Sequence, residues 1–190
     1  MPDPIRCPWC GTDPQYVAYH DEEWGVPVRD SLALFSKLTL DTFQSGLSWL
    51  VVLRKREAIL SAMDNLDPTC LAHWNARQIE QALGDKRIIR NRAKIEAAVN
   101  NARCYLQLVE AGRPFSELLW SHVGDRTIVN KWTQDSELPG YTPESEAMAK
   151  ELKAVGFKWT GPTVCYAFMQ AVGMVNDHRV DCFRYDTCCG

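Results

Sequence analysis

The chain has 190 residues, of which 46% are apolar and 24% are charged, and its formal net charge is −3. This length suits a single unit with a sizeable core, and no apolar run approaches the roughly 20 residues that a membrane helix needs. The first residues lack the apolar segment of a secretory signal, so we expect a cytoplasmic protein. We also expect a monomer that does not bind membranes. The slightly acidic balance argues weakly against nucleic-acid binders as a class.

The first part of the chain has few regular patterns. Residues 1–29 contain several prolines and no sustained period, so we expect an irregular segment there. Helical periodicity begins after Asp30, a candidate N-cap. Further helical patterns cover residues 47–63, 75–84, 91–112 and 113–124. The next segment, 124–142, is rich in turn residues and is expected to be a loop.

Two helices joined by a tight loop are predicted for the last third of the chain. The first follows Thr142-Pro143 and stops at Gly156, and the second begins at Pro162 and stops at Gly173. No strand-like alternation competes anywhere, so the predicted fold class is all-α.

The start of that second helix is a candidate phosphate site. The free N–H groups of Gly161, Thr163 and Val164 would point out of the helix, where its dipole favours an anion such as a DNA phosphate. An ordinary turn between packed helices is the competing interpretation.

Cysteine and histidine residues occur at ligand-like spacing near both ends of the chain. Cys7 and Cys10 precede His20, and His178 precedes Cys182 by four residues. Two ligands from each end would form a Cys2His2 set, which suits a closed, structural Zn²⁺ site. Such a site would hold together two segments that have little pattern for a core.

The spacing leaves alternatives open for these residues. It does not choose between Cys7 and Cys10, it does not exclude Cys188 or Cys189, and both histidines are compatible with ordinary polar roles. A Cys-x-x-Cys pair also occurs in redox dithiols, but these follow a strand, and no strand is predicted here.

Basic residues concentrate in two segments in spite of the net charge. One is 54–56, and the other is 86–94, which ends at Lys94. A local basic surface can steer a polyanion, whereas the alternative is that both segments are solvated helix faces.

Several long motifs resemble one known family. They are YVAYHDEEWGVP (16–27), FQSGLSW (43–49), LRKRE (53–57), GFKWTGPT (156–163), CYAFMQA (165–171) and VNDH (175–178). In this order they resemble the bacterial DNA-3-methyladenine glycosylase I family over nearly the whole chain.

The resemblance implies a helix–hairpin–helix glycosylase fold whose irregular ends are tied by a structural Zn²⁺. Residues 1–190 would form one glycosylase unit, with the helix–hairpin–helix element at 143–173. Residues 1–29 and 174–190 would be the zinc-joined ends. By position the ligands would be Cys7, His20, His178 and Cys182, with Cys10 a bystander.

The implied activity is base-excision repair of double-stranded DNA that contains alkylated bases. Such an enzyme flips the damaged base into a pocket and hydrolyses its N-glycosidic bond. Alkylation at N3 of adenine makes the base cationic, and aromatic faces attract a cation. The candidate pocket residues are aromatic side chains, although some of them would pack in the core: Trp9, Tyr16, Tyr19, Trp24 and Trp49.

Other residues carry further implied roles in DNA binding. Gly46 and Leu47 would form a plug that fills the gap left by the flipped base. Lys158, Gly161 and Thr163 in the hairpin would hold the DNA backbone. The matched pocket motifs contain no lysine that suggests a Schiff-base lyase, so we expect a monofunctional enzyme.

One position departs from the family pattern. The family typically has a glutamate where this chain has Asp41, the candidate catalytic acid. The carboxylate still accepts hydrogen bonds, but its reach falls by about 1.5 Å, one C–C bond length. The alternative function is therefore a damaged-DNA binding protein of the same fold with weak or altered glycosylase activity.

Overall fold

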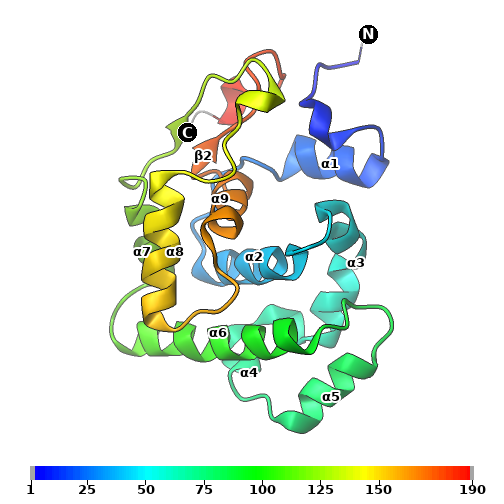
Figure 1. The fold of residues 1–190 in the computed structure, drawn as a ribbon, viewed down its shortest axis with the longest axis vertical. Helices are drawn as coiled ribbons and strands as arrows, with labels where there is room; N and C mark the ends of the chain where they lie inside the picture. Colours follow the sequence, from blue (N-terminus) through cyan, green and yellow to red (C-terminus); the bar gives the residue numbers. More distant parts are fainter. Residues whose placement is uncertain (1–2, 189–190) are drawn as a thin grey trace.

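The computed structural model describes residues 3–188, and nearly all of its regular structure is helical (Figure 1). This result confirms the all-α prediction. The α-helices are α1 Pro14–Glu22, α2 Ser31–Gln44, α3 Trp49–Ala62, α4 Pro68–Leu71, α5 Ala76–Gly84, α6 Arg92–Glu110, α7 Phe115–Ser121, α8 Pro143–Val155 and α9 Pro162–Ala171. The short 3-10 helices are η1 Pro8–Cys10, η2 Asp64–Leu66, η3 Asp135–Glu137 and η4 Asp186–Cys188. The strands are β1 Ile128–Val129 and β2 Val175–Asn176.

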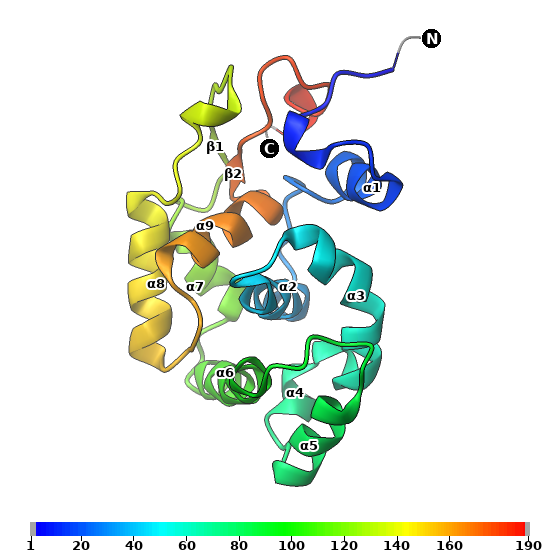
Figure 2. The same ribbon diagram turned by 45° about the vertical axis from the view of Figure 1, so that its right-hand side comes forward.

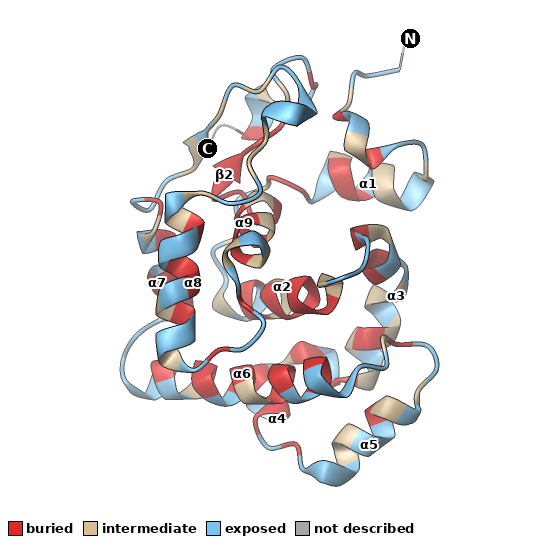
Figure 3. Cartoon of the chain, viewed as in Figure 1, coloured by how far each residue is buried: buried red, intermediate tan, exposed pale blue. Residues whose placement is uncertain are grey.

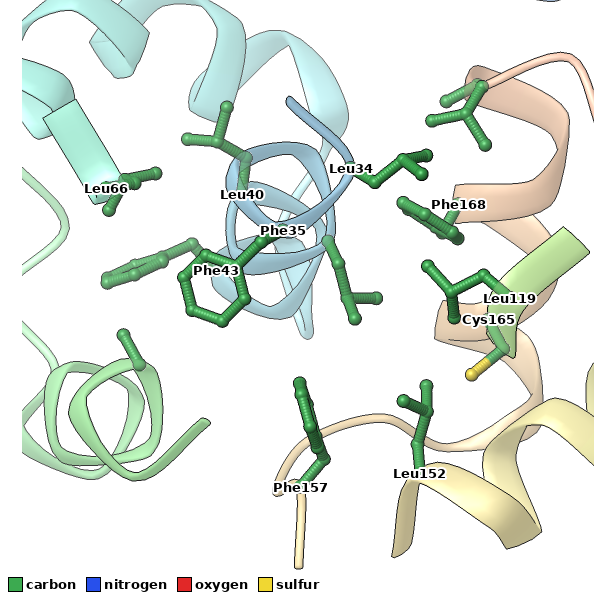
Figure 4. Close-up of a cluster of buried hydrophobic side chains, with 14 of the residues drawn as sticks. Leu34, Phe35, Leu40, Phe43, Leu66, Leu119, Leu152, Phe157, Cys165 and Phe168 are labelled. Atoms are coloured by element: carbon green, nitrogen blue, oxygen red, sulfur yellow. The ribbon is translucent and has the colours of Figure 1, made fainter. Parts of the chain in front are cut away.

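Helix α2 lies at the centre of the molecule. It packs against α3, α6, α7 and α9, and Figure 2 shows it with these helices around it. Burial is accordingly continuous along its second half, from 38 to 43, rather than confined to one stripe (Figure 3). Phe35 and Phe43 lie in the core with Phe157 and Phe168 (Figure 4). The surroundings of α2 therefore fix where the rest of the chain can pack.

Local capping signals set most of the helix ends as predicted. The Asp30 carboxylate accepts a hydrogen bond from the N–H of Ala33 at the start of α2. Asn75 forms a capping box at the start of α5, and Thr142 caps α8. Gly156 ends α8 in the left-handed conformation, with φ of +105°.

Two segments differ from the sequence prediction. Residues 1–29 are not irregular throughout, because α1 forms within them. Asp13 caps that helix and Pro14 occupies its first turn, a position where proline favours a helix start. Segment 124–142 contains η3 and the strand β1, whose Ile128 pairs in parallel with Val175 of β2.

The two ends of the chain lie at the same end of the molecule (Figure 1). The N–H of Phe183 donates to the carbonyl of Ile5, which joins the C-terminal and N-terminal segments directly. Buried apolar residues from Cys7 to Cys182 belong to one cluster. Among residues 3–188, no helix combines the length and apolar character that a membrane crossing requires.

Gly173 allows a close backbone crossing after α9. Its φ is +70°, and a Cβ there would lie 2.5 Å from the backbone nitrogen of Pro27. We expect Gly173→Ala to lower the free energy of unfolding by about 3 kcal/mol or more, because it adds left-handed strain to a backbone clash. Urea or thermal unfolding measures this loss, which corresponds to a Tm lower by about 6 °C or more.

Gly112 provides the matched control for that variant. Its φ is +69°, but a Cβ there would meet nothing within 4 Å. Gly112→Ala is expected to cost only about 1–2 kcal/mol from backbone strain. Equal losses for the two variants would contradict the close-crossing explanation.

Candidate active site and metal centre

A cavity of about 330 Å³ opens between the N-terminal segment and the helices α2, α3 and α9. Its volume lies at the lower end of the range for small-molecule pockets. Five of the twelve lining residues are aromatic, and five others carry polar or charged side chains. The lining residues are Trp9, Tyr16, Tyr19, Trp24, Lys37, Asp41, Gln44, Trp49, Asp135, Leu138, Ala167 and Gln170.

All five predicted aromatic pocket residues line this cavity. The ring centroids of Trp9 and Trp24 lie 4.8 Å apart, and those of Trp9 and Tyr16 lie 5.1 Å apart. Tyr19 and Trp49 form another pair at 5.3 Å. Tyr19, Trp24 and Trp49 are largely buried, so they serve the core and the cavity wall at once. A role in core packing and a role in the base pocket are therefore compatible for these residues.

Asp41 lies inside the cavity in an unusual electrostatic position. Its side chain is only 2% exposed, and Oδ1 accepts a hydrogen bond from Lys37 Nζ at 2.5 Å. Burial raises the pKa of Asp41 above its ordinary value, and the charge and hydrogen bond of Lys37 oppose part of that rise. The other oxygen, Oδ2, is buried without a hydrogen-bond partner.

A second buried polar atom of the cavity also lacks a partner. Trp49 Nε1 makes no hydrogen bond, although the residue is only 7% exposed. Unpaired buried polar groups are costly, and they point to a ligand or water that would satisfy them. Asp41 Oδ2 and Trp49 Nε1 offer one acceptor and one donor to such an occupant.

Lys37 is the charged residue of α2 that the sequence analysis missed. The other residues that line the cavity without having been predicted are Gln44, Asp135, Leu138, Ala167 and Gln170. Lys37 lies outside the matched motifs, but it lines the cavity and its Nζ lies 4.1 Å from the Trp49 ring centroid. The matched pocket motifs contain no lysine, but the cavity that the structure shows does contain one. Its four-residue spacing from Asp41 was the available signal, because residues i and i+4 share a helix face.

The predicted plug follows directly after α2. Gly46 has φ of +78°, and Leu47 is 41% exposed. A smaller cavity beside it is lined by residues of the plug, by Asp41 and by the first turns of α9, including Thr163. The plug, the acid and the start of α9 therefore border one continuous region.

Lys94 anchors this loop from inside the protein. Lys94 is only 3% exposed, and its Nζ donates to the carbonyls of Phe43 and Ser45 at 2.8 and 2.5 Å. Its Nζ also lies 5.6 Å from the ring centroid of Trp159 in the hairpin. The basic-surface interpretation of segment 86–94 is therefore wrong for Lys94, which binds the end of α2 instead.

The other basic residues of the two segments are largely engaged with acids. Arg54 pairs with Asp13, and Arg56 with Glu23. In the second segment, Arg92 pairs with Glu80. These contacts favour the solvated-face interpretation over a dedicated polyanion surface.

The hairpin between α8 and α9 presents backbone groups at the surface. Lys158 is exposed, and its backbone N–H and carbonyl both bond to the side chain of Asn101. Gly161 is the N-cap of α9 and provides no side-chain cap, so no side chain covers this helix start. Trp159 is 42% exposed with φ of +62°.

The predicted metal ligands converge at the joined ends of the chain. Cys7, His20, His178 and Cys182 are all buried, and their ligand atoms lie within 4.8 Å of one another. Sγ of Cys182 lies 3.5 Å from His20 Nε2 and 3.5 Å from His178 Nδ1. A tetrahedral zinc ion with ordinary bond lengths separates sulfur and nitrogen ligands by about 3.6 Å. The donor set and its spacing fit such an ion.

The chemistry of this cluster also suits a cation. Hydrogen bonds from Cys7, His178 and His20 hold the pKa of Cys182 well below its ordinary value, which favours the thiolate that metals bind. On the far side of His20, Nδ1 lies 2.7 Å from an Asp21 oxygen. A carboxylate behind a histidine ligand fixes the orientation of its ring.

The other cysteines within residues 3–188 lie outside the cluster of candidate ligands. Cys10 Sγ donates to the carbonyl of Cys7 at 3.2 Å, and Cys188 is buried near His178 and Arg184. Cys189 lies outside the described residues. Cys7 and Cys10 are both free thiols in the structure.

Comparisons with known proteins agree with this geometry. The family model for methyladenine glycosylase matches residues 9–185. The DNA-3-methyladenine glycosylase 1 of Escherichia coli is 47% identical over 180 residues, which cover 95% of this chain and 96% of that protein.

Solved structures give the same result for the fold. A crystal structure of 3-methyladenine DNA glycosylase I matches with a TM-score of 0.93 and 44% identity, covering 94% of this chain and 98% of that one. The Staphylococcus aureus 3-methyladenine DNA glycosylase I, solved to explain 3-methyladenine recognition, matches with a TM-score of 0.91 and 35% identity over 95% and 96% of the two chains. The chain therefore belongs to the methyladenine glycosylase family and has its all-α glycosylase fold.

Proposed function

We propose that this protein is a monofunctional DNA glycosylase of base-excision repair. It hydrolyses the N-glycosidic bond of an alkylated purine, above all 3-methyladenine, in double-stranded DNA and leaves an abasic site. The observation that carries the proposal is the buried Asp41 carboxylate, whose Oδ2 has no partner inside an aromatic cavity of a methyladenine glycosylase. We propose further that the enzyme works as a cytoplasmic monomer.

The cavity suits an extruded, positively charged base. The flipped base would lie among the rings of Tyr19, Trp24 and Trp49, each of which contributes about 0.5–2 kcal/mol of attraction for a cation. Asp41 Oδ2 would accept a hydrogen bond from the exocyclic amine of the base. A base that is already cationic is a good leaving group, so positioning matters more than acid catalysis.

Hydrolysis then needs only water. The bond between C1′ of the sugar and the purine nitrogen breaks, and its electron pair stays with the base. The water oxygen bonds to C1′, and the water loses a proton to solvent. The Asp41 carboxylate would stabilise positive charge that develops at the sugar. Burial lowers the pKa of Lys37, but the ion pair with Asp41 favours its ammonium form, which lacks the lone pair that a Schiff base requires.

We propose roles in DNA binding for the plug and the hairpin. Leu47 would enter the gap left by the flipped base, with Gly46 providing the left-handed turn beside it. In the element 143–173, Lys158 and the N–H groups of Gly161 and Thr163 would bind the backbone phosphates. The whole chain, 1–190, would act as one glycosylase unit.

We propose a structural Zn²⁺ at Cys7, His20, His178 and Cys182. All four side chains are buried, and together they would fill the four positions of a tetrahedral ion, which leaves none for substrate and distinguishes this site from a catalytic one. When bound, the ion would tie residues 1–29 to residues 174–190. Because Cys7 would be a ligand, a redox dithiol with Cys10 is disfavoured.

Base release from methylated duplex DNA tests the activity. We expect the protein to release 3-methyladenine, detected by chromatography, and Asp41→Asn to reduce the rate by about 100-fold because it removes the buried charge. Glu110→Gln, which removes an exposed acid at the end of α6, should leave the rate unchanged. Binding of methylated DNA without release by the parent, with release gained in Asp41→Glu, would instead identify a damaged-DNA binding protein.

The plug can be tested separately from the pocket. We expect Leu47→Ala to slow base release from duplex DNA by about 10-fold, because the duplex loses its wedge. Binding of free 3-methyladenine, measured by tryptophan fluorescence, should not change. Val51→Ala removes another exposed apolar side chain on the next helix and is the control. A loss of free-base binding in Leu47→Ala would place Leu47 in the pocket rather than in the plug.

Metal content tests the zinc proposal. Elemental analysis should find about one zinc ion per chain in the parent and a loss of most of it in Cys182→Ser, together with a lower Tm. Cys10→Ser is the matched control, because it changes the neighbouring buried thiol and should retain the metal. Equal zinc loss in both variants would show that Cys10 belongs to the ligand set.

A further inference from the structure

Lys37 and Asp41 form an ion pair inside the candidate base pocket. They occupy positions four residues apart on α2, and their side chains are 17% and 2% exposed. Lys37 Nζ is also placed over the Trp49 ring. The lysine thus contacts both the candidate acid and a candidate aromatic wall of the cavity.

This arrangement determines which polar atoms of the cavity remain available to bind a ligand. Lys37 occupies Asp41 Oδ1 and one face of Trp49, whereas Asp41 Oδ2 and Trp49 Nε1 have no partner. A charged carboxylate buried alone is strongly disfavoured, but a neighbouring ammonium group offsets much of that cost. Without Lys37, the buried acid would favour its protonated form, whose O–H is a donor instead of an acceptor.

Other charged or titratable groups surround the pair at longer range. None of the hydrogen bonds described for residues 3–188 joins them to the Asp41 carboxylate, which bonds only to Lys37. They are Tyr16, Tyr19 and Glu23 at α1, Arg56 on α3, Asp135 in η3 and Cys165 on α9. Among the charged groups around it, Lys37 is therefore the one that favours the ionised form of Asp41 against the effect of burial.

We propose that Lys37 is a positioning residue for the reaction, which holds the Asp41 carboxylate ionised and leaves Oδ2 directed at the base. The inference rests on the proposed function. It also defines the charge of the site: the pair is neutral as a whole, so attraction of a cationic base falls mainly to the aromatic rings.

The pH dependence of base release tests this role. Removing Lys37 leaves the burial of Asp41 unopposed, so its pKa rises and ionisation requires a higher pH. We expect Lys37→Met and Lys37→Gln to move the acidic limb of the single-turnover rate upward by about one pH unit or more. The rate should fall about 10-fold near pH 6 and recover to within about threefold of the parent near pH 8.5.

Two further variants separate charge from packing. Lys37→Arg keeps a cation at this position and should restore a near-parental pH profile. Lys131→Met removes an exposed lysine after β1, outside the proposed DNA-binding elements, and should leave the profile unchanged. An equal rate loss at all pH values in Lys37→Met and Lys37→Gln would show a packing role and overturn the inference. An unchanged rate would overturn it as well.

A direct titration makes the result independent of activity. The Asp41 carboxyl signal in carbon NMR, assigned with Asp41→Asn, should titrate at a higher pH in Lys37→Gln than in the parent. An unchanged titration would refute the role of Lys37 even if the enzyme is active. If the parent releases no base but the titration shifts as expected, the proposed function fails while the electrostatic role of Lys37 stands.

Discussion

The burial of the second half of α2 on all sides, over residues 38–43, is the constraint on which the rest of the structure depends. A central helix cannot present a polar face to solvent, so any charge on it must be paired or must face a cavity. Asp41 does both, because Oδ1 accepts a hydrogen bond from Lys37 and the residue lines the cavity. The plug follows the end of the same helix, where Lys94 binds the carbonyls of Phe43 and Ser45. One helix thus positions the acid and the wedge relative to each other.

The metal cluster and the aromatic wall depend on the same short segment. Cys7 precedes Trp9 by two residues, and Tyr19 and His20 are neighbours in α1. The Trp9 ring lies 5.3 Å from the His20 ring, and Trp24 lies 4.6 Å from His178. An ion that fixes the two histidines would therefore also fix the inner edge of the cavity. A structural metal can in this way contribute to recognition without touching the ligand.

The sequence predicted what local rules decide. Asp30, Asn75 and Thr142 cap helices because their side chains bond to backbone groups only two or three residues away. Helix α1 was missed because residues 1–29 contain several prolines and no sustained period, although Asp13 followed by Pro14 is a local signal for a helix start.

Contacts between distant segments were beyond the reach of such rules. Nothing local distinguishes Lys94, which binds carbonyls about 50 residues away, from the solvated lysines near it. Lys37 lies between these two cases. Its spacing from Asp41 is visible in the sequence, but its burial depends on Trp49 and α9. Asp41 lies on the same helix face as this lysine, one turn away, and the two side chains form an ion pair. The departure from the family's glutamate and the lysine in the cavity are therefore best understood as one electrostatic unit rather than as two separate features.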